Sequence, residues 1–260
     1  MRRRNASGVR ATLWGALAGS FKTHAVVLRS IRFGEADRVL HLYTAARGRV
    51  NAIAKGARRP RSRFGGRLEP FFRLSLVLYE GRGELATVTA ADTLDGYPRL
   101  RADGQALNAA ARACDAVLRL LDSSDPNPAA YNLLCRYLAL LEQRAAAGPI
   151  ERRELLAAAL AFRLKLALAA GFVPELASCA RCGEPDGLVA FSGAAGGVVC
   201  AACQGDGFEL SQEAQRFMTE ALGRPLAEAP SAGERALRQA ERAVTATLEH
   251  HAHVQLRAAA

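Results

Sequence analysis

The sequence lacks the short motifs that mark the common catalytic sites. It contains no GxxxxGKS/T phosphate-binding loop, no HExxH metalloprotease motif and no GxSxG nucleophile turn. Acidic residues are sparse in the first 75 residues, which argues against a two-metal nuclease site there. Apart from the cysteines, for which a structural role is argued below, no group of residues has a pattern that only catalysis would explain. The sequence therefore predicts a binding protein and not an enzyme.

Long apolar runs are also absent. A transmembrane helix needs about 20 consecutive apolar residues, and the best window, Leu155–Ala170, is interrupted by Arg163 and Lys165. The apolar run at residues 11–19 is short and glycine-rich, with no clear cleavage site before Lys22, so we expect no signal peptide. Residues 1–21 are expected to form a disordered basic extension, with an over-extended gene start as the alternative, and no membrane partner is expected.

Negative charge is scarce at one end of the chain only. Residues 1–75 carry seventeen Lys and Arg but only three acids, a formal charge of +14. The remaining residues carry eighteen Lys and Arg and twenty-two acids, a formal charge of −4. Such segregation indicates a polyanionic partner for the N-terminal part, with nucleic acid favoured over an anionic membrane. A solubilising surface charge is the alternative.

Four of the six cysteines form two CxxC pairs. Cys179 and Cys182 are separated by seventeen residues from Cys200 and Cys203, which is the spacing of a zinc site built from two knuckles. Four thiolates fill the tetrahedral shell of Zn²⁺ and leave no open position, so one structural zinc ion is predicted. Redox-active pairs and disulfides of an exported domain are the alternatives.

Residues 23–95 have the pattern of a small β-barrel. Five short apolar or alternating segments separated by glycine turns are expected to be strands, and a five-stranded barrel is the simplest closed arrangement. The segments are 25–28, 39–43, 50–54, 71–79 and 85–89.

The most basic stretch lies between the third and fourth of these segments. It holds six cations within thirteen residues and no acid; these are Lys55, Arg58, Arg59, Arg61, Arg63 and Arg67. Phe64 lies among them and is predicted to stack on a base, because barrels of this kind bind single strands with a basic groove and aromatic platforms. A mobile, solvated basic loop is the alternative.

Helical periodicity replaces the strand pattern beyond Gly96. Asn127 and Ser211 are predicted N-caps, a helix that is apolar nearly all round is expected from about Pro149 to Ala170, and the last helix is expected to span Glu234–Leu256. The fold class expected is therefore α+β multidomain. Its parts are a disordered extension (1–21), a barrel (22–95) and a helical domain (96–260) with an inserted four-cysteine ribbon (179–203).

Several stretches resemble the RecO family of bacterial recombination mediators. They are Arg32–Leu40, Lys55–Pro60, Leu68–Phe71 and Gly171–Pro174 followed by Cys179–Gly183. The resemblance covers about residues 22–250 in the right order and is specific.

The resemblance implies an N-terminal OB-fold barrel that binds DNA, and Arg38, inside one matched stretch, joins the candidate DNA-binding residues. It implies binding of single- and double-stranded DNA, strand annealing, and help in loading RecA onto DNA coated with single-strand-binding protein. The partners implied are RecR and the acidic C-terminal tail of single-strand-binding protein, in the cytoplasm at the nucleoid. An RNA-binding, translation-associated factor is the alternative function.

Overall fold

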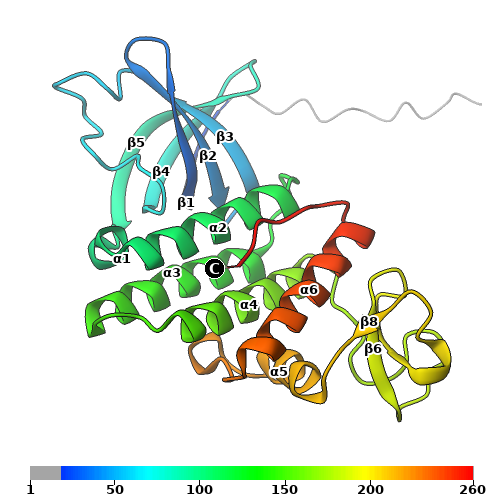
Figure 1. Ribbon diagram of the computed structural model, residues 1–260. Coiled ribbons are helices and arrows are strands. Elements are labelled where there is room, and N and C mark those ends of the chain that lie inside the picture. Colours follow the sequence, from blue (N-terminus) through cyan, green and yellow to red (C-terminus); the bar gives the residue numbers. More distant parts are fainter. Residues whose placement is uncertain (1–18, 260) are drawn as a thin grey trace, which may run out of the picture.

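The computed structural model describes residues 19–259, and these begin with a closed five-stranded barrel (Figure 1). Its strands are β1 (Gly19–Phe33), β2 (Asp37–Thr44), β3 (Gly48–Ala54), β4 (Arg73–Glu80) and β5 (Ala86–Asp95). The order around the barrel is β1-β2-β3-β5-β4, closed by a short parallel pairing of β3 with β5. The predicted five-stranded barrel is confirmed.

Strict alternation explains why these segments are strands. In β4 the side chains of Leu74, Leu76 and Leu78 are buried while the intervening residues are partly exposed, the pattern of a strand with one face towards a core. The long strand β1 serves both sides of the barrel, because its first half pairs with β4 and its second half with β2. The register shifts between Val27 and Arg29, where one pairing gives way to the other.

Strand β1 begins earlier than the sequence analysis expects. Gly19 to Phe21 pair with Glu80 to Leu78 of β4, so the barrel starts at Gly19 and not at residue 22. The rest of the predicted basic extension, residues 1–18, lies outside the described residues.

Six α-helices form the second part of the described chain. They are α1 (Pro98–Ala102), α2 (Gly104–Leu120), α3 (Pro128–Ala147), α4 (Arg152–Ala169), α5 (Gln212–Gly223) and α6 (Glu234–His251). Both predicted N-caps are confirmed, because the side chains of Asn127 and Ser211 accept hydrogen bonds from Ala130 N and Ala214 N. Within the described residues, no helix is long and apolar enough to cross a membrane.

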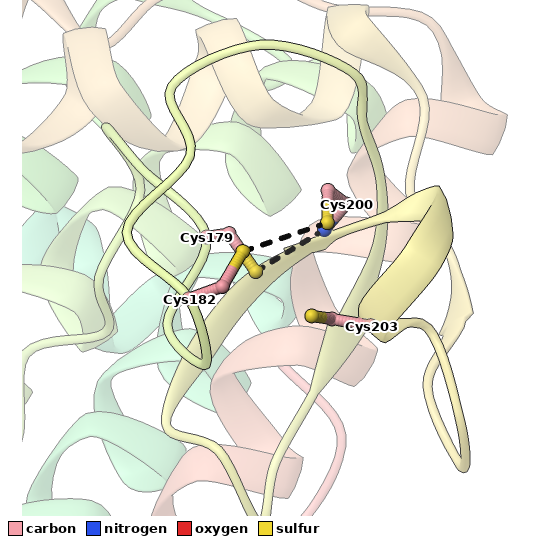
Figure 2. Close-up of side chains that lie close together, drawn as sticks. All are labelled: Cys179, Cys182, Cys200 and Cys203. Carbon is pink, nitrogen blue, oxygen red and sulfur yellow. Dashed lines mark hydrogen bonds between the residues drawn. The ribbon is translucent and has the colours of Figure 1, made fainter.

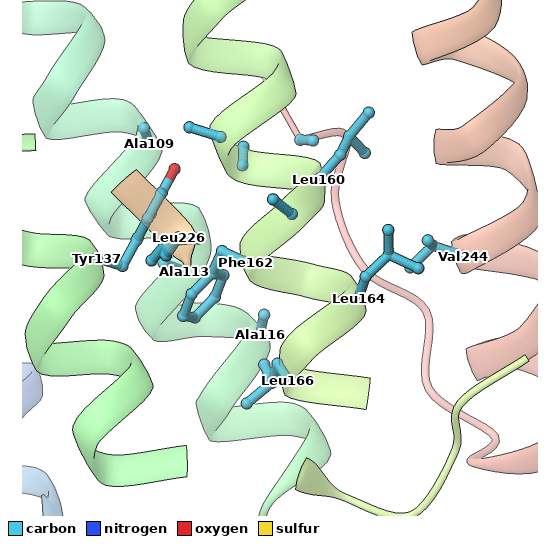
Figure 3. Close-up of a cluster of buried hydrophobic side chains, with 14 of the residues drawn as sticks. Ala109, Ala113, Ala116, Tyr137, Leu160, Phe162, Leu164, Leu166, Leu226 and Val244 are labelled. Atoms are coloured by element: carbon cyan, nitrogen blue, oxygen red, sulfur yellow. The ribbon is translucent and has the colours of Figure 1, made fainter. Parts of the chain in front are cut away.

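Helix α4 is the centre of the bundle, as its all-round apolar sequence predicts. Figure 3 shows its side chains between those of α2 on one side and Val244 of α6 on the other. The ring of Phe162 in α4 stacks on Tyr137 of α3 with ring centroids 4.5 Å apart, and both side chains are buried. Such packing holds α2, α3 and α6 to one common element.

Helix α6 is shorter than expected. It ends at His251 rather than Leu256, and His253 has a left-handed backbone with φ 54°. Residues 252–259 leave the helix and cross back over the bundle, so packing overrides the helical propensity of this stretch.

Two arginines hold this returning segment in place. Arg163 of α4, with only 4% of its surface exposed, donates to the carbonyl of Arg257. Arg112 of α2 donates to the carbonyl of Ala258 at 2.6 Å. The buried guanidinium of Arg163 also lies 3.7 Å from the carboxylate of Glu241, so its charge is paired as a buried charge must be.

The ribbon is inserted between α4 and α5. Its strands β6 (Leu188–Ser192), β7 (Gly197–Cys200) and β8 (Phe208–Glu209) form a sheet in the order β7-β6-β8. The turn between β6 and β7 packs closely on α6, because His251 Nε2 lies 2.9 Å from the carbonyl oxygen of Gly193. In Figure 1 the ribbon lies on the far side of the bundle from the barrel.

The barrel is joined to the bundle by a shared hydrophobic core. Barrel residues and helical residues belong to one buried cluster; the contributors from the barrel and the linker after it are Val26, Leu28, Tyr43, Phe71 and Tyr97. The backbone approaches closely at Gly48, where an added Cβ would lie 2.3 Å from the carbonyl oxygen of Asp125. Next to it, Arg49 N donates to the Ser123 carbonyl at 3.1 Å.

We expect Gly48→Ala to destabilise the protein more than Gly34→Ala. Both glycines have similar positive φ angles, 50° and 53°, but no atom lies within 4 Å of a Cβ at Gly34. Gly34→Ala should lose about 1 kcal/mol through the left-handed backbone alone, and Gly48→Ala about 3 kcal/mol because the interface must also open. Urea unfolding followed by circular dichroism measures both; equal losses would contradict the close approach at Gly48.

Candidate metal centre and nucleic-acid interface

The four ribbon cysteines lie together as the spacing predicts. Their sulfur atoms all lie within 4.8 Å of one another, and Figure 2 shows the two pairs facing each other from the Cys179–Cys182 knuckle and the end of β7. Gly183 follows the first knuckle with φ 81° and donates to the Cys179 carbonyl at 2.8 Å. A glycine suits this left-handed position, which closes the knuckle tightly.

The backbone around the cluster favours the thiolate form of Cys179. Cys200 N lies 3.4 Å from Cys179 Sγ, and this N–H lowers the pKa of Cys179 to about 6. Hydrogen bonds within the cluster, first with Cys182, raise the pKa of Cys203 to about 12. Four sulfurs this close can all ionise together only if a cation neutralises them.

The sulfur spacing fits a shared metal ion better than a disulfide. Cys182 Sγ and Cys200 Sγ are 3.8 Å apart, far longer than the roughly 2.05 Å of an S–S bond. A tetrahedral shell with metal–sulfur bonds of about 2.3 Å has edges of about 3.8 Å. The cluster can therefore hold a metal ion with all four positions taken by protein sulfur.

The basic loop, residues 55–72 between β3 and β4, presents its charges to solvent. All six predicted cations are exposed: Lys55, Arg58, Arg59, Arg61, Arg63 and Arg67. The loop is tied to the β1–β2 hairpin, because Gly56 N donates to Asp37 Oδ1 at 2.8 Å and Arg58 N donates to the Ala36 carbonyl at 2.8 Å. The near end of the loop is therefore ordered against the hairpin.

None of these six cations forms an ion pair within residues 19–259. Arg38, the other basic candidate, differs from them. Its guanidinium pairs with Glu69 Oε1 at 2.7 Å and donates to Ser30 Oγ at 3.0 Å. Arg38 anchors the far end of the loop through Glu69, and its DNA contact stays a prediction.

The predicted role of Phe64 as a base-stacking platform is wrong for this fold. Its side chain is 1% exposed and belongs to the barrel core together with Ala57 and Leu68 of the same loop. These three apolar residues fold inwards while the cations between them point outwards. The ring of Phe64 is accordingly closed to a nucleic-acid base.

Exposed apolar side chains beside the loop are not predicted by the sequence pattern. Phe33 and Ile31 of β1 are 54% and 39% exposed, and both precede the hairpin turn against which the loop is tied. Alternation along β1 could have placed them on one face with Arg29, but it could not show which face lies outside.

Both parts of the chain match known families. The family model described as "Recombination protein O N terminal" matches residues 19–97, and "Recombination protein O C terminal" matches residues 101–259. A protein named DNA repair protein RecO from Rubrobacter xylanophilus is 40% identical over 232 residues, covering 86% of this chain and 90% of the relative. A protein of the same name from Geobacter sulfurreducens is 37% identical over 204 residues, covering 78% and 80%.

We expect the purified protein to contain one metal ion per chain and Cys200→Ser to lose it. A serine hydroxyl is a poor replacement for a thiolate, and three sulfurs leave the shell open. Cys135→Ser is the matched control, because Cys135 is a free thiol outside the cluster. Elemental analysis of the desalted proteins measures the content; full occupancy in Cys200→Ser would contradict a four-sulfur site.

Proposed function

The chain belongs to the RecO family of DNA repair proteins, and from this premise we propose that it is a non-enzymatic recombination mediator that binds single- and double-stranded DNA through its barrel. The observation that carries the proposal is the basic loop, with six exposed cations and no ion pair among the described residues. Unpaired guanidinium groups are suited to phosphate oxygens, which they bind in a bidentate manner. The same family places its members in DNA repair, which favours DNA over the RNA alternative.

We propose that strand annealing follows from charge neutralisation. Two complementary strands repel each other because each carries one negative charge per nucleotide, and their approach is costly at low salt. The N-terminal 75 residues carry a formal charge of +14, so one protein can screen both strands at once. Bringing them together raises their local concentration, and base pairing then completes the reaction.

The proposed protein partners are RecR, the C-terminal tail of single-strand-binding protein, and indirectly RecA. The helical domain supports an acidic peptide ligand, because a groove of about 360 Å³ on α2 and α4 combines basic and apolar side chains. It is lined by Gln105, Asn108, Ala109, Arg112, Arg152 and Leu155. Guanidinium groups would bind carboxylates there while the apolar side chains contact an apolar chain end. This role places the protein in the cytoplasm at the nucleoid.

We propose that the metal in the ribbon is a single zinc ion with a structural role. A tetrahedral site of four thiolates is typical of structural zinc among the common metals, and no position remains for water or substrate. The metal would fix the turn between β6 and β7 that packs on α6. It takes no part in DNA binding in this proposal.

Replacing Arg58, Arg59, Arg61 and Arg63 by Glu should weaken single-stranded DNA binding at least tenfold at physiological salt. Loss of four phosphate contacts should also flatten the dependence of log affinity on log salt by about 3, since each contact contributes roughly 0.7 for single strands. Fluorescence anisotropy of a labelled oligonucleotide across a salt series measures both quantities.

The control carries the same change in net charge elsewhere. Arg136, Arg152, Arg153 and Arg216 are exposed on the helical domain, and replacing these four by Glu should leave the salt dependence nearly unchanged. An equal loss in both variants would indicate that only total charge matters, and it would contradict the basic loop as the DNA site.

Cys200→Ser should retain single-stranded DNA affinity within about twofold of the wild type, because distant sites act independently. The ribbon and the barrel lie on opposite sides of the bundle (Figure 1). The same anisotropy measurement tests this, with circular dichroism to confirm that the barrel remains folded. A loss comparable to that of the loop variant would contradict a purely structural metal.

A further inference from the structure

The outer surface of β1, β2 and β3 carries a row of apolar side chains across the sheet. Ile31 of β1 lies opposite Val39 of β2, and Val39 lies opposite Ile53 of β3. Ile31 is exposed, and Val39 and Ile53 are partly exposed. Their strand neighbours Leu40 and Ala52 face the barrel core. These apolar residues therefore lie outside the core and form a continuous strip on the barrel surface.

Two further rows of side chains flank this apolar strip. On one side the row is Arg29, His41 and Asn51, in which His41 Nδ1 lies 2.8 Å from Asn51 Oδ1. On the other side Phe33 lies opposite Asp37. Across the three strands the surface thus presents a polar row, then the apolar strip, then the aromatic ring of Phe33. This combination suits a chain that carries both phosphates and bases.

Phe33 is the most exposed large apolar side chain in the described part of the protein, at 54%. It lies at the end of β1, immediately before a turn that the basic loop contacts. Arg58 donates through Nη1 to the Gly34 carbonyl at 3.2 Å, and Lys55 directly follows β3. The turn between β1 and β2, which Phe33 precedes and Arg58 contacts, lies at the end of the barrel away from the helices (Figure 1).

We propose that single-stranded DNA lies across the outer face of β1, β2 and β3, with one base stacked on the ring of Phe33. This inference rests on the proposed function and identifies the side chain that separates single strands from duplex. Lys55, Arg58 and Arg29 bind the phosphates, and the strip formed by Ile31, Val39 and Ile53 contacts sugars and bases. A base inside a duplex has both faces covered, so Phe33 adds affinity only for unpaired bases.

The charges around the ring indicate the path of the bound strand. Asp37 is engaged by the backbone N–H of Gly56, whereas Glu35 is exposed in the turn. Glu35 repels phosphate at the tip of the hairpin, so the DNA backbone keeps to the sheet between Lys55 after β3 and Arg29 of β1. The occupant proposed is a nucleic acid, because the apolar strip can contact bases while the cations along its border bind phosphates.

The test compares Phe33→Ala, Phe33→Leu and Phe33→Tyr with Leu94→Ala as the matched control. Leu94 is 40% exposed on β5, near the end of the barrel that leads into α1. The ligands are oligo-dT, a fully abasic strand with the same number of phosphates, and a closed dumbbell duplex whose two end loops are base-free linkers. Anisotropy at one fixed salt concentration gives the affinities, and thermal unfolding confirms that the variants are folded.

We expect Phe33→Ala and Phe33→Leu to weaken oligo-dT binding by about fivefold or more, the lower end of the effect of one base stack. Phe33→Tyr and Leu94→Ala should bind as the wild type does. Binding of the abasic strand and of the dumbbell should be the same for all variants, because neither offers an unpaired base.

Unchanged oligo-dT binding by Phe33→Ala would overturn the inference, and so would an equal loss on the abasic strand. A normal affinity for Phe33→Leu would overturn base stacking in favour of a simple apolar contact. These outcomes are distinct from failure of the proposed function, in which charge reversal of the basic loop leaves DNA binding intact.

Discussion

The shared hydrophobic core between the barrel and the helical bundle is the constraint on which the rest of the structure depends. It requires unusual backbone at two buried positions, since Phe71 and Tyr97 have positive φ angles of 76° and 46°. Such conformations cost free energy in residues other than glycine and persist only where surrounding packing holds them. Because one end of the barrel is fixed on the helices in this way, the other end remains open to a ligand, together with the adjoining part of the outer face of β1, β2 and β3.

The basic loop follows the same logic on a smaller scale. Ala57, Phe64 and Leu68 enter the barrel core, and their burial holds the intervening cations at the surface, where none pairs with an acid of residues 19–259. A loop backbone that is held in position in this way does not have to be ordered when a ligand binds, which lowers the entropic cost of association. The four-cysteine cluster lies in the ribbon, on the other side of the bundle, and the turn of that ribbon between β6 and β7 packs on α6.

Much of this arrangement was predictable from local patterns. Alternation in β4, the caps at Asn127 and Ser211, and the spacing of the four cysteines each specify their structure within a few residues along the chain. The outcome for Phe64 was not predictable in this way, because the burial of a loop side chain depends on contacts with distant strands. Phe33 was missed for the same reason: β1 is apolar in part, and only barrel closure decides which of its faces is outside.

The returning segment at residues 252–259 has a consequence for how the chain folds during synthesis. Each pairing in the barrel lies within residues 19–95, so the barrel can form while the helices are still being made. Helix α4 cannot reach its final packing so early. Its Arg163 pairs with Glu241 and donates to the carbonyl of Arg257, and both of these residues are synthesised much later. Until they emerge, Arg163 would be a buried charge without a partner. The strand pairings of the barrel can therefore form before the centre of the bundle closes.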